Sequence, residues 1–376
     1  PLTYNSNDSS RSRLLARVFG GKPVEPRSAE TQLTRAAAWQ DDVAIAFGGS
    51  SYLVQWREEE ALYAARLGLD GRSLDGRGIE LTREKTANGE NVVWDGTQYV
   101  VSWTERRDGA LTSVIRFVSP SQGLLEEQLV GAGLPLTAGP DGVTLLGFAG
   151  DDGRLRVRRL FGASRTFENA SVAVTPAGER AGNPAAAWNG SEYLVVWNEL
   201  ELDRWSWQFE FWVGARVRGA RVSRELTVRD TRPITIGDAP ERVDHVTGIA
   251  SDGSGWLVTW ETEYTSIRAR RVASDLTLAR ELFFGTGFGS TVTFDATRYV
   301  VGWRGVQPAS AVTIADVTRG GALRGIDVVT ATEMPGRISL APGAIAYTRL
   351  TRELGGVPRA YVRGLEAVTI RRRAVR

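Results

Sequence analysis

Cysteine is absent from the 376 residues of this chain, and histidine and methionine occur once each. Without cysteine the chain forms no disulfide framework, no thiolate nucleophile and no Cys-ligated metal site. The one histidine, His245, is a general base or ligand in one interpretation and an ordinary loop or core residue in the other. No acidic cluster surrounds it in the sequence, so we expect no metal and no other cofactor.

Long apolar runs and catalytic motifs are missing as well. No segment approaches the ~20 apolar residues of a membrane-spanning helix. No signal peptide precedes Pro1, and we expect that a leader or upstream domain was removed. No phosphate-binding loop, dinucleotide fingerprint or Gly-x-Ser-x-Gly elbow occurs. We therefore expect no enzymatic activity, although the sequence alone leaves a Ser–His–Asp arrangement open.

Charge is nearly balanced, at +2, and the excess arginines lie close to the two ends of the chain. We interpret residues 1–13 and 371–376 as solvated tails rather than as a nucleic-acid binding surface, and we expect no nucleic-acid partner.

Glycine and tryptophan, by contrast, are abundant, with 42 and 12 residues, and they recur in a repeat. Each unit has an aromatic residue, a short glycine-containing turn and an apolar run ending in tryptophan. Five clear copies span residues 47–56, 94–103, 188–197, 251–260 and 294–303, and two degenerate copies span 140–148 and 341–347. Their last aromatic residues lie 43–49 positions apart, with one spacing of 63. A repeat of this length indicates a repeat architecture.

Each unit has the pattern of four strands. Asp-Gly and Asn-Gly between apolar runs are strong hairpin signals, because these residues tolerate positive φ. Four strands in about 45 residues is the blade of a β-propeller. The sequence therefore predicts an all-β propeller of seven four-stranded blades over residues 14–370. The pattern of the third strand occurs near both chain ends, which leaves eight blades as an alternative. We expect the N- and C-terminal strands to share a blade and close the ring.

The units resemble a β-propeller repeat of secreted and surface proteins of bacteria, in which blades of the form aWdGtnYLVvW recur. The copies Trp94–Trp103 and Trp188–Trp197 carry the resemblance best. That repeat occurs mostly in proteins of unknown function. The resemblance implies an extracytoplasmic location, meaning secreted, periplasmic or on the cell surface, and it implies no particular chemistry.

Arginine recurs late in the third strand, and glutamate follows several of the tryptophans. A ring of arginines that binds polyanions is one interpretation. We favour a structural one, in which the glutamates pair with the arginines across strands. The arginines are Arg66, Arg116, Arg159, Arg216, Arg271 and Arg363, and the glutamates are Glu58, Glu105, Glu199 and Glu261.

One unit breaks the repeat. Residues 198–212 are inserted into the fourth unit and contain Trp205, Trp207, Phe209, Phe211 and Trp212. The first four alternate with other residues, so an extended hairpin would carry them on one face. Exposed aromatic rows bind proteins and carbohydrates; packing against a neighbouring blade is the structural alternative.

These observations favour a non-catalytic binding or scaffold module that recognises another protein, within a larger bacterial surface assembly. The five aromatic residues of the insertion are the predicted contact. The alternatives are a glycan-binding lectin, or a glycan-cleaving hydrolase with two carboxylates at the mouth of the propeller channel.

Overall fold

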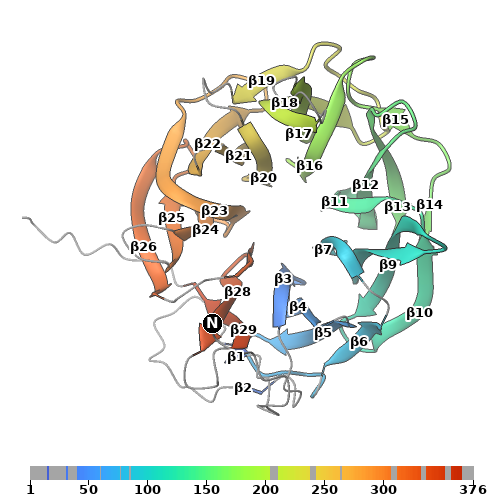
Figure 1. Ribbon diagram of the computed structural model, residues 1–376, viewed down its shortest axis with the longest axis vertical. Helices are drawn as coiled ribbons and strands as arrows, with labels where there is room; N and C mark the ends of the chain where they lie inside the picture. The colour runs from blue at the N-terminus through green and yellow to red at the C-terminus, as the bar shows by residue number, and fades with distance from the viewer. Residues whose placement is uncertain are drawn as a thin grey trace, which may run out of the picture.

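The computed structural model describes residues 15–16, 31–32, 40–59, 61–76, 78–83, 86–203, 211–237, 243–262, 265–305, 311–331, 336–351 and 357–365. Apart from one turn of 3-10 helix, η1 (Pro140–Gly142), the regular elements of these residues are all strands. The sheets stand like spokes around a central opening, as in a β-propeller (Figure 1). The predicted all-β propeller fold is thus confirmed.

The first three sheets follow the chain from Gln40. The first has β3 (Gln40–Phe47), β4 (Ser51–Glu58), β5 (Ala61–Gly68) and β6 (Ile79–Thr82). The second has β7 (Thr86–Trp94), β8 (Tyr99–Arg107), β9 (Ala110–Ser119) and β10 (Gly123–Val130). The third has β11 (Leu134–Ala138), β12 (Val143–Ala149), β13 (Leu155–Phe161), β14 (Thr166–Phe167) and β15 (Val172–Ala173).

The other three sheets complete the ring. The first has β16 (Arg180–Trp188), β17 (Glu192–Asp203), β18 (Phe211–Ser223) and β19 (Ile234–Gly237). The second has β20 (Val243–Ser251), β21 (Gly255–Thr262), β22 (Ser266–Ala273), β23 (Leu282–Phe294), β24 (Tyr299–Gly305), β25 (Ala311–Val317) and β26 (Leu323–Ala331). The third has β27 (Ile338–Ala341), β28 (Ala344–Thr351), β29 (Val357–Gly364), β1 (Leu15–Ala16) and β2 (Thr31–Gln32).

The predicted division into seven separate four-stranded blades is not what the strand pairing shows. The described strands form six sheets, of which three have four strands, two have five and one has seven. The cause is β23, whose first half pairs with β22 and whose second half, from Gly287, pairs with β24. No turn separates the two halves, so two units of the repeat become one continuous sheet.

Hairpin turns in the repeat form for the reason the sequence indicates. Asp95 Oδ1 accepts the backbone N–H groups of Thr97 and Gln98, and Gly96 adopts φ +102°. Asn189 caps its turn in the same way, with Gly190 at φ +100°. The side chain therefore replaces the backbone acceptor of a turn, and glycine supplies the left-handed conformation.

Apolar packing lies between neighbouring sheets. Five tryptophans of the second strands are buried there: Trp56, Trp103, Trp197, Trp260 and Trp303. Space for them is made by glycines, since a Cβ on Gly78 would lie 2.9 Å from the ring of Trp56. The last sheet packs against the first through Ala346 and Val362 on one side and Val54 and Trp56 on the other. These tryptophans are core residues.

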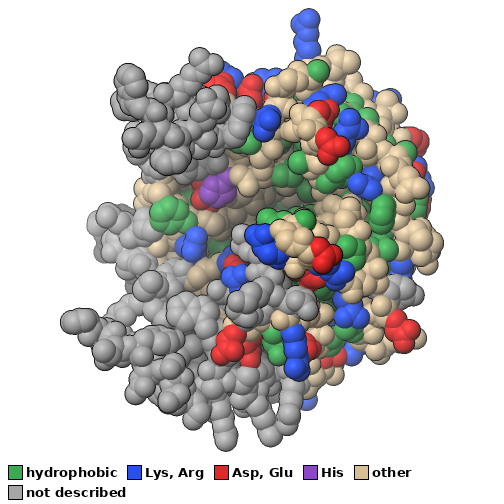
Figure 2. Space-filling model, turned by 45° about the vertical axis from the view of Figure 1, so that its right-hand side comes forward, with side chains coloured by type: hydrophobic (Ala, Val, Ile, Leu, Met, Phe, Trp, Pro, Cys, Tyr) green, Lys and Arg blue, Asp and Glu red, His purple; other side chains and the backbone are tan. Residues whose placement is uncertain are grey.

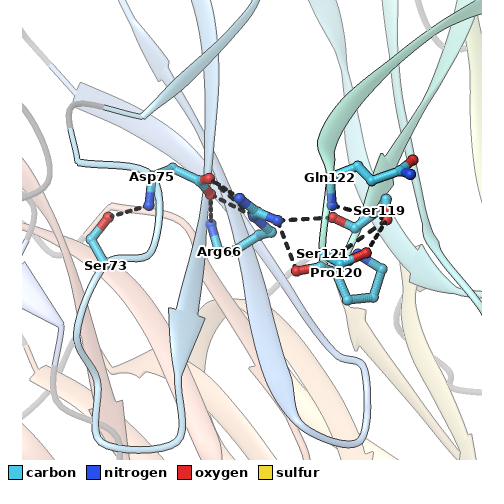
Figure 3. A network of polar contacts seen from close by, with 7 residues as sticks. All are labelled: Arg66, Ser73, Asp75, Ser119, Pro120, Ser121 and Gln122. Atoms are coloured by element: carbon cyan, nitrogen blue, oxygen red, sulfur yellow. Dashed lines mark hydrogen bonds and ion pairs between the residues drawn. The ribbon is translucent and has the colours of Figure 1, made fainter.

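Arginines of the third strand join neighbouring sheets. Arg66 of β5 pairs with Asp75 in its own sheet and donates to the carbonyl oxygens of Ser119 and Pro120 in the next sheet, at 3.2 and 2.7 Å (Figure 3). Arg221 repeats the arrangement with Asp230 and the carbonyl oxygen of Ser274. The recurring arginines are therefore structural.

Their acidic partners differ from the predicted glutamates. Of the predicted pairs, Arg216 with Glu199, at 3.0 Å, is the one found among the described ion pairs. Arg159 pairs with Glu168 and Arg271 with Asp252. Since glutamates lie at the ends of the second strands, and these arginines lie near the far ends of the third strands, most of the predicted partners are too distant along the sheet.

The chain ends meet in the last sheet. β1 runs parallel to β29, with Leu15 opposite Tyr361 and Ala16 opposite Val362, and β2 is antiparallel to β1. The order of strands is β27, β28, β29, β1 and β2, from the innermost strand outward.

Candidate functional site

A central cavity of about 860 Å³ lies on the axis of the ring. Every sheet contributes to its wall through an innermost strand, and representative lining residues are Ala44 (β3), Asn91 (β7), Leu136 (β11), Ala185 (β16), Thr247 (β20), Thr291 (β23) and Ser339 (β27). Figure 2 shows the molecule hollowed, with the single histidine at the wall beside charged side chains. A cavity of this volume is in the range of ligand sites.

Bulges in the innermost strands shape one end of this cavity. The pairing with the second strand shifts register between Asp41 and Ala44, between Gly182 and Ala185, and between Phe288 and Thr291. Asp42, Asn183 and Gly289 lie within the shifts at φ +50°, +45° and +62°. Asp, Asn and Gly are the residues that adopt this conformation most readily, and a bulge redirects side chains near it. We call this end, defined by Asp42, His245, Arg304 and Arg337, the channel mouth.

His245 and Glu261 form a pair at the mouth. His245 lies in β20 and lines the cavity, with its side chain 42% exposed. Its Nε2 is 3.3 Å from Oε2 of Glu261, which is 1% exposed in β21. The other carboxylate oxygen of Glu261 accepts the backbone N–H of Ser290 at 2.7 Å. The structure therefore places His245 against a buried acid, which the sequence did not predict.

Glu261 is an acid whose ionisation is opposed by its surroundings. Burial raises the pKa of its carboxyl group, while the hydrogen bond from Ser290 and the nearby His245 and Arg304 partly counteract that shift. Desolvation disfavours the charged form of a carboxylate, which is the direction seen here.

Two arginines face the cavity from neighbouring sheets. Arg304 is at the end of β24, and burial lowers the pKa of its guanidinium, with Arg337 acting in the same direction and Glu261 and Asp42 in the opposite one. Arg337 precedes β27 and lies 3.6 Å from Asp42. Asp42 also pairs with Arg57. Positive charge thus gathers on this side of the mouth.

Asp42 is the one carboxylate among the described residues that line the cavity. Two arginines already surround it. Among the same described residues, no three histidine, aspartate or glutamate side chains come together in a way that could hold a metal ion. The wall therefore offers cationic and neutral polar groups for binding.

The strands that flank the predicted contact residues, β17 and β18, reach the same end of the ring. Asp203 pairs with Phe211 and Leu202 with Trp212, so β17 and β18 extend beyond Arg180, the first residue of β16. Trp205, Trp207 and Phe209 are outside the described residues, and Phe211 and Trp212 are described in their backbone alone. The insertion 198–212 begins at Asn198, whose Oδ1 accepts the N–H of Val246, next to His245.

Sequence reasoning missed Arg304 and the pairing of Glu261, although a signal existed. Both directly follow the repeat tryptophan, as does Asn198. Asn198 and Glu261 each bind a backbone N–H of an innermost strand that follows in the chain. An alignment of the repeats would have shown that these three residues occupy equivalent positions in their units.

No protein-family model and no curated protein matches the chain. Solved structures do. The β-propeller domain of the Trilobed protease from Pyrococcus furiosus, described as having an open velcro topology, matches with a TM-score of 0.51 at 10% identity, over 86% of this chain and 92% of that chain. A chain of a mitotic checkpoint complex matches with a TM-score of 0.52 at 11% identity, over 93% and 99%.

A prolyl endopeptidase matches with a TM-score of 0.51 at 13% identity, over 89% of this chain and 49% of that chain. At such identities the matches show the propeller fold alone. Folds of this kind carry unrelated functions, so function has to be argued from the site. The described residues include no helix long and apolar enough to cross a membrane.

Proposed function

We propose that this chain is a non-catalytic binding module that recognises another protein through the channel mouth and the aromatic insertion 198–212. The observation that carries the proposal is the cavity wall, which every sheet builds and in which the one described carboxylate, Asp42, is held by arginines. A rigid ring with a hollow of mixed polar and apolar lining at one end, and an aromatic-rich insertion between two strands that reach that end, provides a rim and candidate anchors.

Glycan hydrolysis is less well supported. It needs a pair of carboxyl groups about 5–10 Å apart that flank the scissile bond. Among the described residues, Glu261 is a second acid near the mouth, but it is buried, contacts His245 and accepts a hydrogen bond from Ser290. Turnover of any glycan in a panel, abolished by Asp42→Asn, would overturn the non-catalytic assignment.

We also propose a ring of seven repeats, with β23 counted once for each of its halves. Seven apolar clusters support this count, each between two neighbouring units, including one between the halves of the seven-stranded sheet. The pairing of β1 with β29 supports closure by strands from both chain ends. An extracytoplasmic place in a bacterial assembly is the location that we propose, on the basis of the repeat alone.

The test is capture of a partner from cells of the source, followed by affinity measurement with the purified partner. Trp205→Ala combined with Trp207→Ala is expected to weaken binding ~30-fold or more, since truncation of anchoring tryptophans costs about 2 kcal/mol. Phe283→Ala is the matched control, because it removes an exposed aromatic residue from the outer part of the ring. Unchanged affinity in the double variant would remove the insertion from the interface.

A further inference from the structure

The channel mouth holds a guanidinium without an ion-pair partner. Among the described residues no carboxylate lies within 4 Å of Arg304, and its one hydrogen bond there is long, from Nε to the carbonyl oxygen of Phe288 at 3.5 Å. A guanidinium has five N–H donors in a planar fork. Most of the donors of Arg304 are therefore available to a group that enters the cavity.

The neighbouring backbone is shaped around this side chain. Gly289 adopts φ +62°, and a Cβ at this position would lie 3.2 Å from Nε of Arg304. Phe288, directly opposite Arg304 in the strand pair, is 41% exposed, and its ring centre is 5.9 Å from the guanidinium carbon. Arg304 thus lies over a glycine bulge, with an aromatic ring beside it and the cavity in front.

Among the described residues, the two carboxylates that act on Arg304 are already engaged by other groups. Asp42 is shared by Arg57 and Arg337, and Glu261 is held by Ser290 and His245. Burial disfavours the positive charge of Arg304. An entering anion would relieve that cost, because charge pairing is stronger away from bulk water.

We propose that Arg304, assisted by Arg337, binds a carboxylate of an acidic peptide segment that the partner inserts into the channel mouth. This inference rests on the protein-recognition function proposed above. A carboxylate matches the guanidinium fork with two parallel hydrogen bonds. The ring of Phe288 provides an apolar wall for the methylene groups of a glutamate, and the paired ends of β17 and β18, at Asp203 and Phe211, lie at the same end of the ring.

The test uses fluorescein-labelled hexaglutamate as the probe and hexaglutamine as its uncharged match, with binding followed by fluorescence anisotropy. We expect the full chain to bind hexaglutamate and not hexaglutamine. Arg304→Gln should weaken binding at least tenfold. Arg304→Lys should recover only part of the affinity, because an ammonium cannot form the bidentate pair.

The matched control is Arg72→Gln, which removes the same charge. Arg72 follows the last residue of β5, Gly68, which pairs with Ser51 at the end of β4 remote from the mouth. The side chain of Arg72 is 79% exposed. Equal losses in the Arg72 and Arg304 variants would overturn the site in favour of general charge attraction. Melting curves establish that each variant is folded, and the signal of 15N-labelled Arg304 Nε on addition of probe reports contact directly.

Competition experiments distinguish a peptide carboxylate from other anions as the ligand of this site. Oligogalacturonate or inorganic phosphate that displaces the probe at a lower concentration than unlabelled hexaglutamate would overturn the peptide assignment. A purified partner that binds normally to the Arg304→Gln variant would also overturn this inference, while leaving protein recognition intact. Loss of partner binding in the tryptophan double variant tests the function itself, so the two failures are distinguishable.

Discussion

At the scale of single residues, Glu261 shows how the repeat serves two purposes. The side chain after a repeat tryptophan bonds the backbone of a later innermost strand, as Asn198 and Glu261 both do. In Glu261 that role is filled by an acid 1% exposed, in contact with the only histidine of the chain. Glu261 therefore accepts a structural hydrogen bond from Ser290 and also contacts His245 at the mouth.

Stability should depend on pH through Glu261. Burial raises the pKa of its carboxyl group in the folded chain above that in the unfolded chain. The folded state therefore keeps the proton longer, and the stability associated with it is lost as pH rises from about 4.5, the usual value, through the folded pKa. Glu261→Gln should flatten this fall, measured as urea midpoints at several pH values relative to the unmodified chain.

His245 is in contact with Glu261, so the comparison is repeated with His245→Gln in both the unmodified chain and the Glu261→Gln variant. The urea midpoint of the unmodified chain relative to that of the Glu261→Gln variant should fall as pH rises. If it rises instead, the assignment of Glu261 as a buried, destabilised carboxylate is contradicted. Identical pH profiles would contradict it too.

The sequence indicates which residues form the core, but it does not indicate which acidic groups pair with the arginines. Trp197 is buried, and it ends an apolar run bounded by turns, which is the pattern of a strand covered on both faces. The repeat predicted the wrong acid for Arg66, since Asp75 lies in a turn whose course no periodicity reveals. Arg304 was missed for a related reason: its importance comes from the glycine bulge at Gly289, which only tertiary structure displays.

At the scale of elements, the arginine contacts between sheets should be worth more than surface ion pairs. The side chains of Arg66 and Asp75 are 12% and 7% exposed, and Arg66 also donates to the next sheet. Arg66→Met should lower the free energy of unfolding by about 3 kcal/mol, because it leaves a buried carboxylate without its partner. Chemical denaturation measures the loss.

Arg72→Gln is the control variant. Arg72 forms an ion pair with Asp70, and the two side chains are 79% and 60% exposed. Such a pair contributes about 0–1 kcal/mol. A variant of Arg66 that is no less stable than that of Arg72 would mean that the contact between sheets contributes little.

Strand number per sheet illustrates what local patterns leave undecided. The hairpins were correctly predicted from their turns, for example the one that Asp95 caps. The merging of two units was not, because Leu282–Phe294 has a strand pattern throughout and nothing in it says where one pairing ends and the next begins. Whether a sheet is continuous depends on which strands pair, and β22 and β24 pair with different halves of β23.

At the scale of the whole molecule, closure of the ring can be tested because the chain has no cysteine. Ala16 is opposite Val362 in the parallel pair of β1 and β29. Ala16→Cys with Val362→Cys should form a disulfide on oxidation, read as a shift in non-reducing electrophoresis, and should raise the melting temperature, since the cross-link closes a loop of almost the whole chain.

The control pairs Ala16→Cys with Ala360→Cys, a residue of β29 displaced by two positions along the strand. Equal cross-linking of both pairs would indicate that β1 has no fixed register, and absence of cross-linking in the first pair would contradict closure by these strands.

The continuous seven-stranded sheet has a consequence for the mouth. His245, Glu261, Phe288 and Arg304 all belong to it, on β20, β21, β23 and β24. His245 contacts Glu261 in the first half of this sheet, and Phe288 lies opposite Arg304 in the second half. β23 is shared by both halves, and the N–H of Ser290 in β23 donates to Glu261, so the two pairs are tied together at the mouth before any ligand arrives. Such preorganisation reduces the ordering entropy lost on association. Arg337, which precedes β27, and Asp42, in β3, lie outside this sheet, and they are the members of the mouth whose distance to Arg304 an arriving anion can still adjust.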